Sequence, residues 1–177
     1  MRHSTAVTVI LLCGASVCAR AQWLNCLPAG VPLAALLPAP YKLVQMPEMI
    51  VTLYEAETSF RQIYTDDRTH TADPQPTWMG YSVGKWEGDT LVVDGVGFND
   101  RSWLDAMGHQ HSDAMRITER YHRRDFGHME VQISIDDPKT FTRPFTIKFN
   151  QALLPDPDLI ESFCSEDEKD VGHLVAK

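Results

Sequence analysis

The sequence predicts an all-β, mainly antiparallel fold in which a meander closes into an up-and-down barrel or a strongly curved sheet. Residues 129–136 alternate strictly between apolar odd positions and polar even positions, and residues 145–150 repeat the pattern. This period of two is typical of a strand with one buried and one solvated face. No window carries three turns of helical periodicity. Because closure removes exposed strand edges, a barrel is the simplest architecture, and a two-sheet sandwich is the alternative.

The first 21 residues are predicted to be a signal peptide. A basic start at Arg2 precedes an apolar run over residues 6–17, and Ala19-Arg20-Ala21 has the small-x-small pattern that signal peptidase cleaves. The apolar run is shorter than the roughly 20 residues that span a bilayer. We therefore expect an exported protein, periplasmic or extracellular, that has no membrane partner after cleavage.

Residues 22–48 are expected to form an irregular segment that wraps around the body, because five prolines interrupt it. The single β-domain is predicted over residues 49–177. A turn at Glu87-Gly88-Asp89 joins two of its strands, since glycine can take the positive φ that a tight turn requires. A short helix is expected over residues 159–163. The predicted strands occupy residues 50–54, 60–64, 79–86, 90–98, 115–123, 129–136 and 145–150.

The charge balance argues against nucleic acid as a partner. The full chain carries a formal charge of −8, and removing residues 1–21 takes away two arginines and no acidic residue, which leaves −10. An acidic surface of this kind repels phosphate backbones. The hydrophobic content of 44% is enough for the core of one ordinary domain.

One disulfide is expected in the mature chain. Two of the four cysteines leave with the signal peptide, and Cys26 and Cys164 remain near opposite ends. In an oxidising compartment an even pair is usually joined. Closing so long a loop would contribute up to about 4 to 5 kcal/mol in the loop-entropy description. Two buried free thiols or a metal-binding pair are the alternatives.

One long run of residues resembles a large family of exported bacterial proteins. The run from Pro76 to Asp94 reads PTWMGYSVGKWEGDTLVVD, and the resemblance continues through residues 97–101 and Trp103 and includes both remaining cysteines. This resemblance implies no activity, since the family is uncharacterised. The succession of hairpins is also similar to lipocalin and fatty-acid-binding barrels, but a likeness at the level of the fold assigns no ligand.

Two long connections between strands hold most of the polar side chains. Residues 66–76 and residues 99–113 are both longer than a hairpin requires, and long loops rich in side-chain chemistry are often binding elements. In an up-and-down topology both would lie at one barrel mouth. We therefore predict a small-molecule ligand near these loops, with binding residues drawn from Arg61, His70, Trp78, Asn99, Arg101, Trp103 and Arg120.

His109 and His111 are the candidate metal ligands. Two histidines two positions apart on an extended backbone face the same side, so both imidazoles could reach one transition metal, with His70, Asp94 or Asp113 completing the shell. Hydrogen bonding within the loop or to a ligand, and simple solvation, are the alternatives for this pair. No cofactor other than such a metal is indicated.

Charged residues inside predicted strands are the remaining candidates. A charge that points inward is costly unless it is paired. Arg61, Asp94, Glu119 and Arg120 therefore either lie on the solvated face, or form cross-strand ion pairs, or line a polar cavity in which an arginine receives a ligand. The tryptophans are more simply explained as core residues than as ligand-stacking residues.

Two classes of function follow. The first is an exported β-barrel that binds a small molecule of unknown identity. The second is an enzyme in the same cavity, either a metal-assisted hydrolase or a cofactor-free isomerase or cyclase, with His109, His111, Asp94 and Glu119 as candidate catalytic residues. A purely structural or interaction module is a third alternative. The enzyme requires the histidines and carboxylates to converge in one cavity.

Overall fold

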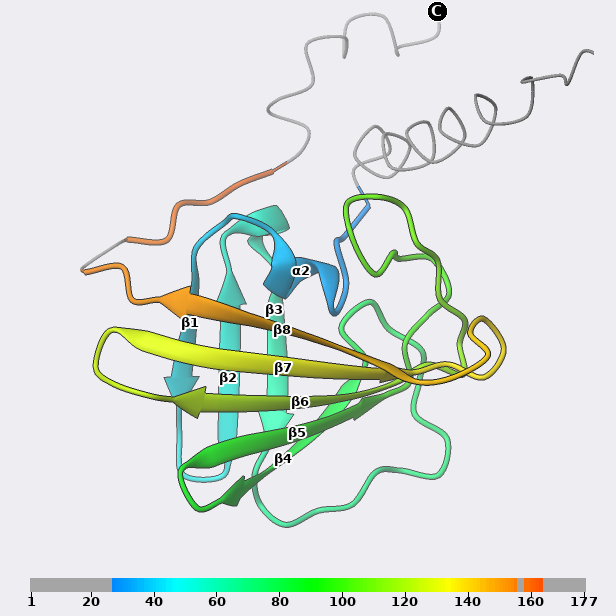
Figure 1. The fold of residues 1–177 in the computed structure, drawn as a ribbon, viewed down its shortest axis with the longest axis horizontal. Helices are drawn as coiled ribbons and strands as arrows, with labels where there is room; N and C mark the ends of the chain where they lie inside the picture. Colours follow the sequence, from blue (N-terminus) through cyan, green and yellow to red (C-terminus); the bar gives the residue numbers. More distant parts are fainter. Residues whose placement is uncertain (1–26, 156–157, 164–177) are drawn as a thin grey trace, which may run out of the picture.

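The computed structural model describes residues 27–155 and 158–163, which contain one curled β-sheet of eight strands (Figure 1). One helical turn, α2 (Leu33–Leu36), and one 3-10 turn, η1 (Ala56–Thr58), complete the regular structure of this part of the chain. The predicted fold, all-β and mainly antiparallel, is confirmed. The strands lie in the sheet in chain order: β1 (Tyr41–Gln45), β2 (Met49–Tyr54), β3 (Phe60–Tyr64), β4 (Tyr81–Glu87), β5 (Thr90–Val96), β6 (Arg116–Arg123), β7 (His128–Asp136) and β8 (Phe145–Ala152).

The sheet bends into a half-barrel and does not close into a cylinder. In Figure 1, β1 to β3 stand upright in the view while β5 to β8 cross it, so the sheet wraps around its own concave face. Within the described residues, the edge strands β1 and β8 do not pair with each other through backbone hydrogen bonds. A side-chain hydrogen bond from the Tyr41 hydroxyl to Gln151 Oε1 links the two edges at one point. The strongly curved sheet is therefore the form that the chain adopts.

The pairing of β3 with β4 differs from the expected meander. These strands run parallel, with Ile63 opposite Ser82 and Tyr64 opposite Val83, whereas the six other neighbouring pairs are antiparallel. Parallel strands need a connection of a dozen or more residues, and residues 65–80 provide one. The long connection thus lets β4 run in the same direction as β3, and it also carries polar side chains.

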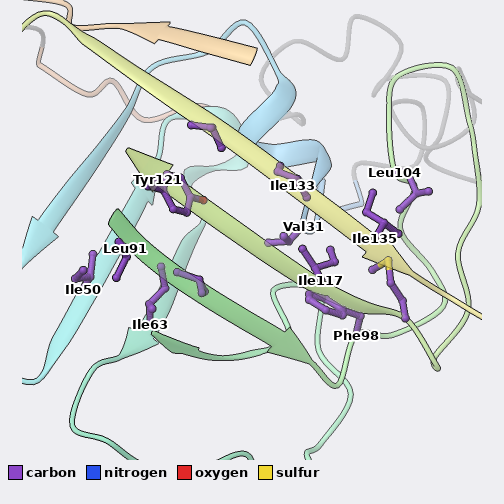
Figure 2. Close-up of a cluster of buried hydrophobic side chains, with 13 residues drawn as sticks. Val31, Ile50, Ile63, Leu91, Phe98, Leu104, Ile117, Tyr121, Ile133 and Ile135 are labelled. Carbon is purple, nitrogen blue, oxygen red and sulfur yellow. The ribbon is translucent and has the colours of Figure 1, made fainter. Parts of the chain in front are cut away.

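Alternation along the strands builds the core on the concave face. Val131, Ile133 and Ile135 of β7 are almost fully buried, while the residues between them are partly exposed, as the period of two predicts. Phe98 from the loop after β5 and Val31 from the N-terminal segment join the same cluster (Figure 2). The core therefore consists mainly of strand residues, with the loops closing its ends.

The N-terminal segment is more regular than predicted. Residues 41–45 form β1, and residues 33–36 form the turn α2, which packs its apolar side chains against Tyr54. Pro40 and Pro47 flank β1, which lies at the edge of the sheet where proline is tolerated. The helix expected over residues 159–163 is not formed. The predicted signal peptide, Cys26 and Cys164 lie outside the described residues.

Candidate functional site

A buried ion pair crosses the concave interior. Arg61 of β3 and Glu119 of β6 lie 2.6 Å apart from Nη2 to Oε2, and the two side chains are 1% and 0% exposed. Arg61 Nε donates to Ser82 Oγ at 3.0 Å, and the Tyr121 hydroxyl donates to Glu119 Oε1 at 2.8 Å. Burial lowers the pKa of Arg61, but the charge and hydrogen bond of Glu119 outweigh that effect and raise it overall. The Glu119 carboxylate therefore favours the charged form of Arg61, and among the described residues Arg61 Nη1 and Nη2 and Glu119 Oε2 have no partner in hydrogen-bond geometry.

This pair accounts for two of the predicted site residues. Arg61 and Glu119 were candidates for ligand binding and catalysis, and the structure places them as each other's partner in the core. Arg120 points to the opposite, convex face, where its Nη2 donates to Glu87 Oε2 at 2.9 Å. Arg61, Glu119 and Arg120 thus all form ion pairs, which was one of the alternatives for charges inside strands. Arg61 and Glu119 pair across the interior, since β3 and β6 are not neighbours in the sheet.

His70 and Asp94 meet on the convex face. His70 Nε2 lies 3.1 Å from Asp94 Oδ2, and Arg116 Nε donates to Asp94 Oδ1 at 3.0 Å. The His70 ring also makes an edge contact with Tyr81, at 6.0 Å between ring centroids. The His70 Nδ1 atom is buried and has no hydrogen-bond partner among the described residues. This cluster anchors the loop after β3 to β5 and β6.

The two predicted metal ligands separate. His109 is exposed and its Nδ1 lies 2.6 Å from Asp105 Oδ2, while His111 is 4% exposed and its Nε2 lies 2.7 Å from Ser102 Oγ. The other ring nitrogen of His111 lies 3.1 Å from the Ser112 carbonyl. The two imidazoles therefore face different surroundings, one exposed and one buried. In the described part of the chain, no group of three or more His, Cys, Asp or Glu side chains is arranged to hold a metal ion.

Ser102 and His111 resemble a nucleophile and its base, but they are closed off. A carbonyl holds one nitrogen of the imidazole and a hydroxyl contacts the other, which is the arrangement that would activate a serine. Ser102 is 1% exposed because Gly30 of the N-terminal segment lies directly over it. The pair therefore joins the loop to the N-terminal segment.

The end of the first long connection meets the beginning of the second. The backbone of Thr77 bridges to Phe98, with hydrogen bonds from Thr77 N to Gly97 O at 3.0 Å and from Asn99 N to Thr77 O at 2.9 Å. The remaining loop residues among the predicted binding set make contacts within the protein. Asn99 Oδ1 accepts from Arg101 N, the Trp78 carbonyl accepts from Val31 N of the N-terminal segment, and Trp103 pairs with Gln110. These contacts order the loops.

A groove of about 730 Å³ lies elsewhere, at the open side of the half-barrel. One wall is the chain from Leu37 through β1, and the other is the β6–β7 turn together with the end of β8. Tyr41 and Gln151, which carry the link between the sheet edges, both line it. None of the predicted site residues contributes to this groove. The full lining is Leu37, Pro38, Ala39, Pro40, Tyr41, Lys42, Leu43, Val44, Arg123, Phe126, Gly127, His128, Met129, Gln151, Ala152, Leu153 and Leu154.

Large apolar side chains are left exposed around this groove. Leu43 and Val44 of β1 are 39% and 42% exposed, Leu153 and Leu154 after β8 are 51% and 53% exposed, and Phe126 in the β6–β7 turn is 81% exposed. These three segments are far apart in the chain. The one local signal in the sequence is the pair Leu153-Leu154, two exposed leucines directly after the end of β8. Sequence reasoning missed the groove because β1 itself was not predicted.

Comparison with protein-family models, curated proteins and solved structures finds no match to this chain. The likeness to exported bacterial proteins thus remains an expectation from the quoted motif, and the structure adds the half-barrel fold. No helix within the described residues is both long and apolar enough to cross a membrane.

Proposed function

We propose that this chain is an exported binding protein whose ligand is a small, largely apolar molecule held in the groove between β1, the β6–β7 turn and the end of β8. The observation that carries the proposal is the convergence of exposed apolar side chains on one concavity of about 730 Å³. Ligand sites are typically concave, mainly apolar and roughly 300 to 1,000 Å³ in volume.

The cost of leaving these side chains in water supports this proposal. Leu43, Leu153 and Leu154 each expose more than a third of their surface, and each such side chain would gain up to roughly 1 to 2 kcal/mol on full burial. A ligand that covers them recovers part of that free energy. The Tyr41 hydroxyl and the Gln151 amide supply polar atoms at the groove for orienting the ligand.

The enzyme alternative has less support from the geometry. Asp94 lies on the convex face of the sheet and Glu119 on the concave face, while His109 and His111 have separate partners. The histidines and carboxylates that would have to converge do not do so. We therefore propose binding without catalysis.

A neutral fluorescent probe tests the proposal. N-phenyl-1-naphthylamine should bind the purified protein saturably, with one probe per chain and enhanced emission. Replacing Leu43 with glutamate should weaken this binding at least tenfold, because a charge would then face the apolar walls, a loss of about 1.4 kcal/mol or more.

The matched control is Leu53→Glu. Leu53 lies on the neighbouring strand β2, is 37% exposed against 39% for Leu43, and does not line the groove. Its replacement should leave probe affinity within about twofold. Absence of saturable binding, or equal losses in both variants, would contradict the proposal. A dimer that forms with rising concentration and disappears in Leu43→Glu would instead assign the groove to a second copy of the chain.

A further inference from the structure

The convex face of the sheet is polar at one end and apolar at the other. Alternation places the even-numbered residues of β6, β7 and β8 on this face, and all of them are polar or charged except Ala152. In β1 to β3, the same face carries Val44, Val51, Leu53 and Phe60, which the strand register places beside one another. The apolar character of the convex face is thus concentrated on the first three strands, away from the groove interior.

The register arranges these side chains in two rows that cross the three strands. Thr52 and Arg61, the residues that alternate with Leu53 and Phe60, are buried on the concave side, so both rows point outward. The six residues are called the outer β1–β3 face below. Its two rows are Lys42, Leu53 and Phe60, and Val44, Val51 and Gln62.

The apolar members of this face are unusually exposed. Phe60 is 60% exposed, Val44 42% and Leu53 37%. The tyrosine next along β3 is covered, because the Arg68 guanidinium lies over the Tyr64 ring, 3.8 Å from its centroid. Contiguous apolar residues that stay exposed in this way often mark a contact with another molecule.

One cation and one aromatic ring flank the centre of the face symmetrically. Lys42 and Phe60 lie directly opposite Leu53, one on each neighbouring strand, so both are one strand spacing from β2. Lys42 is exposed and forms no ion pair with a described residue. A rotation of half a turn about β2 therefore exchanges the position of the cation with that of the ring.

We infer that the outer β1–β3 face binds a second copy of this chain, with the two faces stacked about a two-fold axis that runs along β2. This axis sets Leu53 and Val51 against their own counterparts and brings Lys42 of each copy over the Phe60 ring of the other. A cation over the face of an aromatic ring is attracted by the ring's quadrupole, and symmetry makes the contact twice. Face-to-face packing with strands within about 30° of each other is a common way for two sheets to stack.

The size of the face limits the strength of this dimer. Each partner in a standard interface buries roughly 800 Å², which is more than six side chains on three strands provide, so polar neighbours must form the rim. A dissociation constant on the order of 10 to 100 µM is therefore expected. The inference does not rest on the proposed function, because Leu53 and Phe60 do not line the groove.

Sedimentation equilibrium of the purified protein tests the inference. Between about 1 and 300 µM, the wild-type chain should pass from monomer to dimer. Leu53→Glu and Phe60→Glu should each raise the dissociation constant at least tenfold, because each substitution enters the interface twice. Leu43→Glu is the matched control: Leu43 is 39% exposed against 37% for Leu53, and it lies opposite Thr52 on the other side of the sheet. The control should leave the dissociation constant within about twofold.

Charge changes at Lys42 test the direction of the two-fold axis. Lys42→Glu should raise the dissociation constant about fivefold or more, because a carboxylate would then lie against the negative face of the Phe60 ring. Lys42→Arg should keep the wild-type value, since a guanidinium also binds an aromatic face. Lys148→Glu is the control, because it makes the same change of charge at an exposed position on β8. Its dissociation constant should stay within about twofold of the wild-type value.

Four results would overturn the inference. The first is a monomer at every concentration. The second is a dimer that Leu43→Glu abolishes and Leu53→Glu retains, since the groove would then be the interface. Equal effects of Lys42→Glu and Lys148→Glu would rule out the axis along β2. Co-sedimentation of the monomer with phospholipid vesicles that Phe60→Glu abolishes would assign the face to a membrane surface. Circular dichroism of each variant should match that of the wild type, which ties a lost dimer to the face and not to unfolding.

Discussion

Replacing Glu119 with glutamine would leave the Arg61 guanidinium in the core without a counter-charge. The two groups are almost fully buried and lie 2.6 Å apart. At that separation, an effective dielectric of about 20 gives an attraction of about 6 kcal/mol, and this attraction offsets the cost of keeping both charges out of water. Removing one partner of a buried pair typically destabilises a protein by about 3 to 5 kcal/mol. We expect Glu119→Gln to lower the free energy of unfolding by about that amount.

Urea unfolding followed by circular dichroism would measure this loss. The double variant Arg61→Met with Glu119→Leu is the informative comparison, because replacing both charges with apolar groups of similar volume is often close to neutral. It should recover most of the stability that the single variant loses. A loss of less than about 1 kcal/mol in Glu119→Gln would refute the reasoning, since water or a rearranged partner would then be solvating Arg61. A double variant no more stable than the single one would show that Ser82 and Tyr121 need the charges for their own packing.

The remaining predictions concern loop anchoring. Burial opposes ionisation of Asp137, but hydrogen bonds from Ser112 hold the pKa of this carboxyl below its usual value. Because the folded pKa is lowered, the contribution of Asp137 to stability is full above the unfolded pKa of about 3.9 and is lost as pH falls through the folded pKa. Asp137→Asn should therefore lower the free energy of unfolding by about 1 to 3 kcal/mol at pH 7 and not at pH 2.5. The control is Asp136→Asn, a change at the exposed neighbour, which should not alter the free energy of unfolding in a pH-dependent way. Gly30→Ala should lower the urea midpoint more than Gly88→Ala. Both glycines have positive φ. An added Cβ at Gly30 would meet Ser102 Oγ at 2.7 Å, whereas an added Cβ at Gly88 would meet nothing within 4 Å. Equal midpoints in these two variants would contradict the role of Gly30 as the cover of Ser102.

The groove proposed as the binding site illustrates how a site can be missed by reading along the chain. Leu43 belongs to a proline-flanked stretch, Phe126 to a turn, and Leu154 to the segment after the last strand. Each of these segments, read by itself, gives an ordinary exposed residue. Their shared role follows from the curvature of the sheet, which brings its first and last strands together at Tyr41 and Gln151.

The loop residues illustrate the converse. His70 and His111 were chosen because histidines and polar loops often carry chemistry. In the folded chain these side chains hold the loops against the sheet and the N-terminal segment. A side chain that can catalyse can equally satisfy a buried hydrogen bond, and burial decides between the two roles.

The amino-acid sequence by itself determined the local structure: the alternation at residues 129–136, the turn at Gly88 and most of the strands follow from side-chain periodicity and backbone preference, which act over a few residues. Tertiary structure alone decided the parallel pairing of β3 with β4, the partnership of Arg61 with Glu119 across the interior and the groove at the open side. These features depend on how far the sheet bends and on which distant faces it brings together. That bending sums small twists over eight strands, and no single stretch of the chain records it.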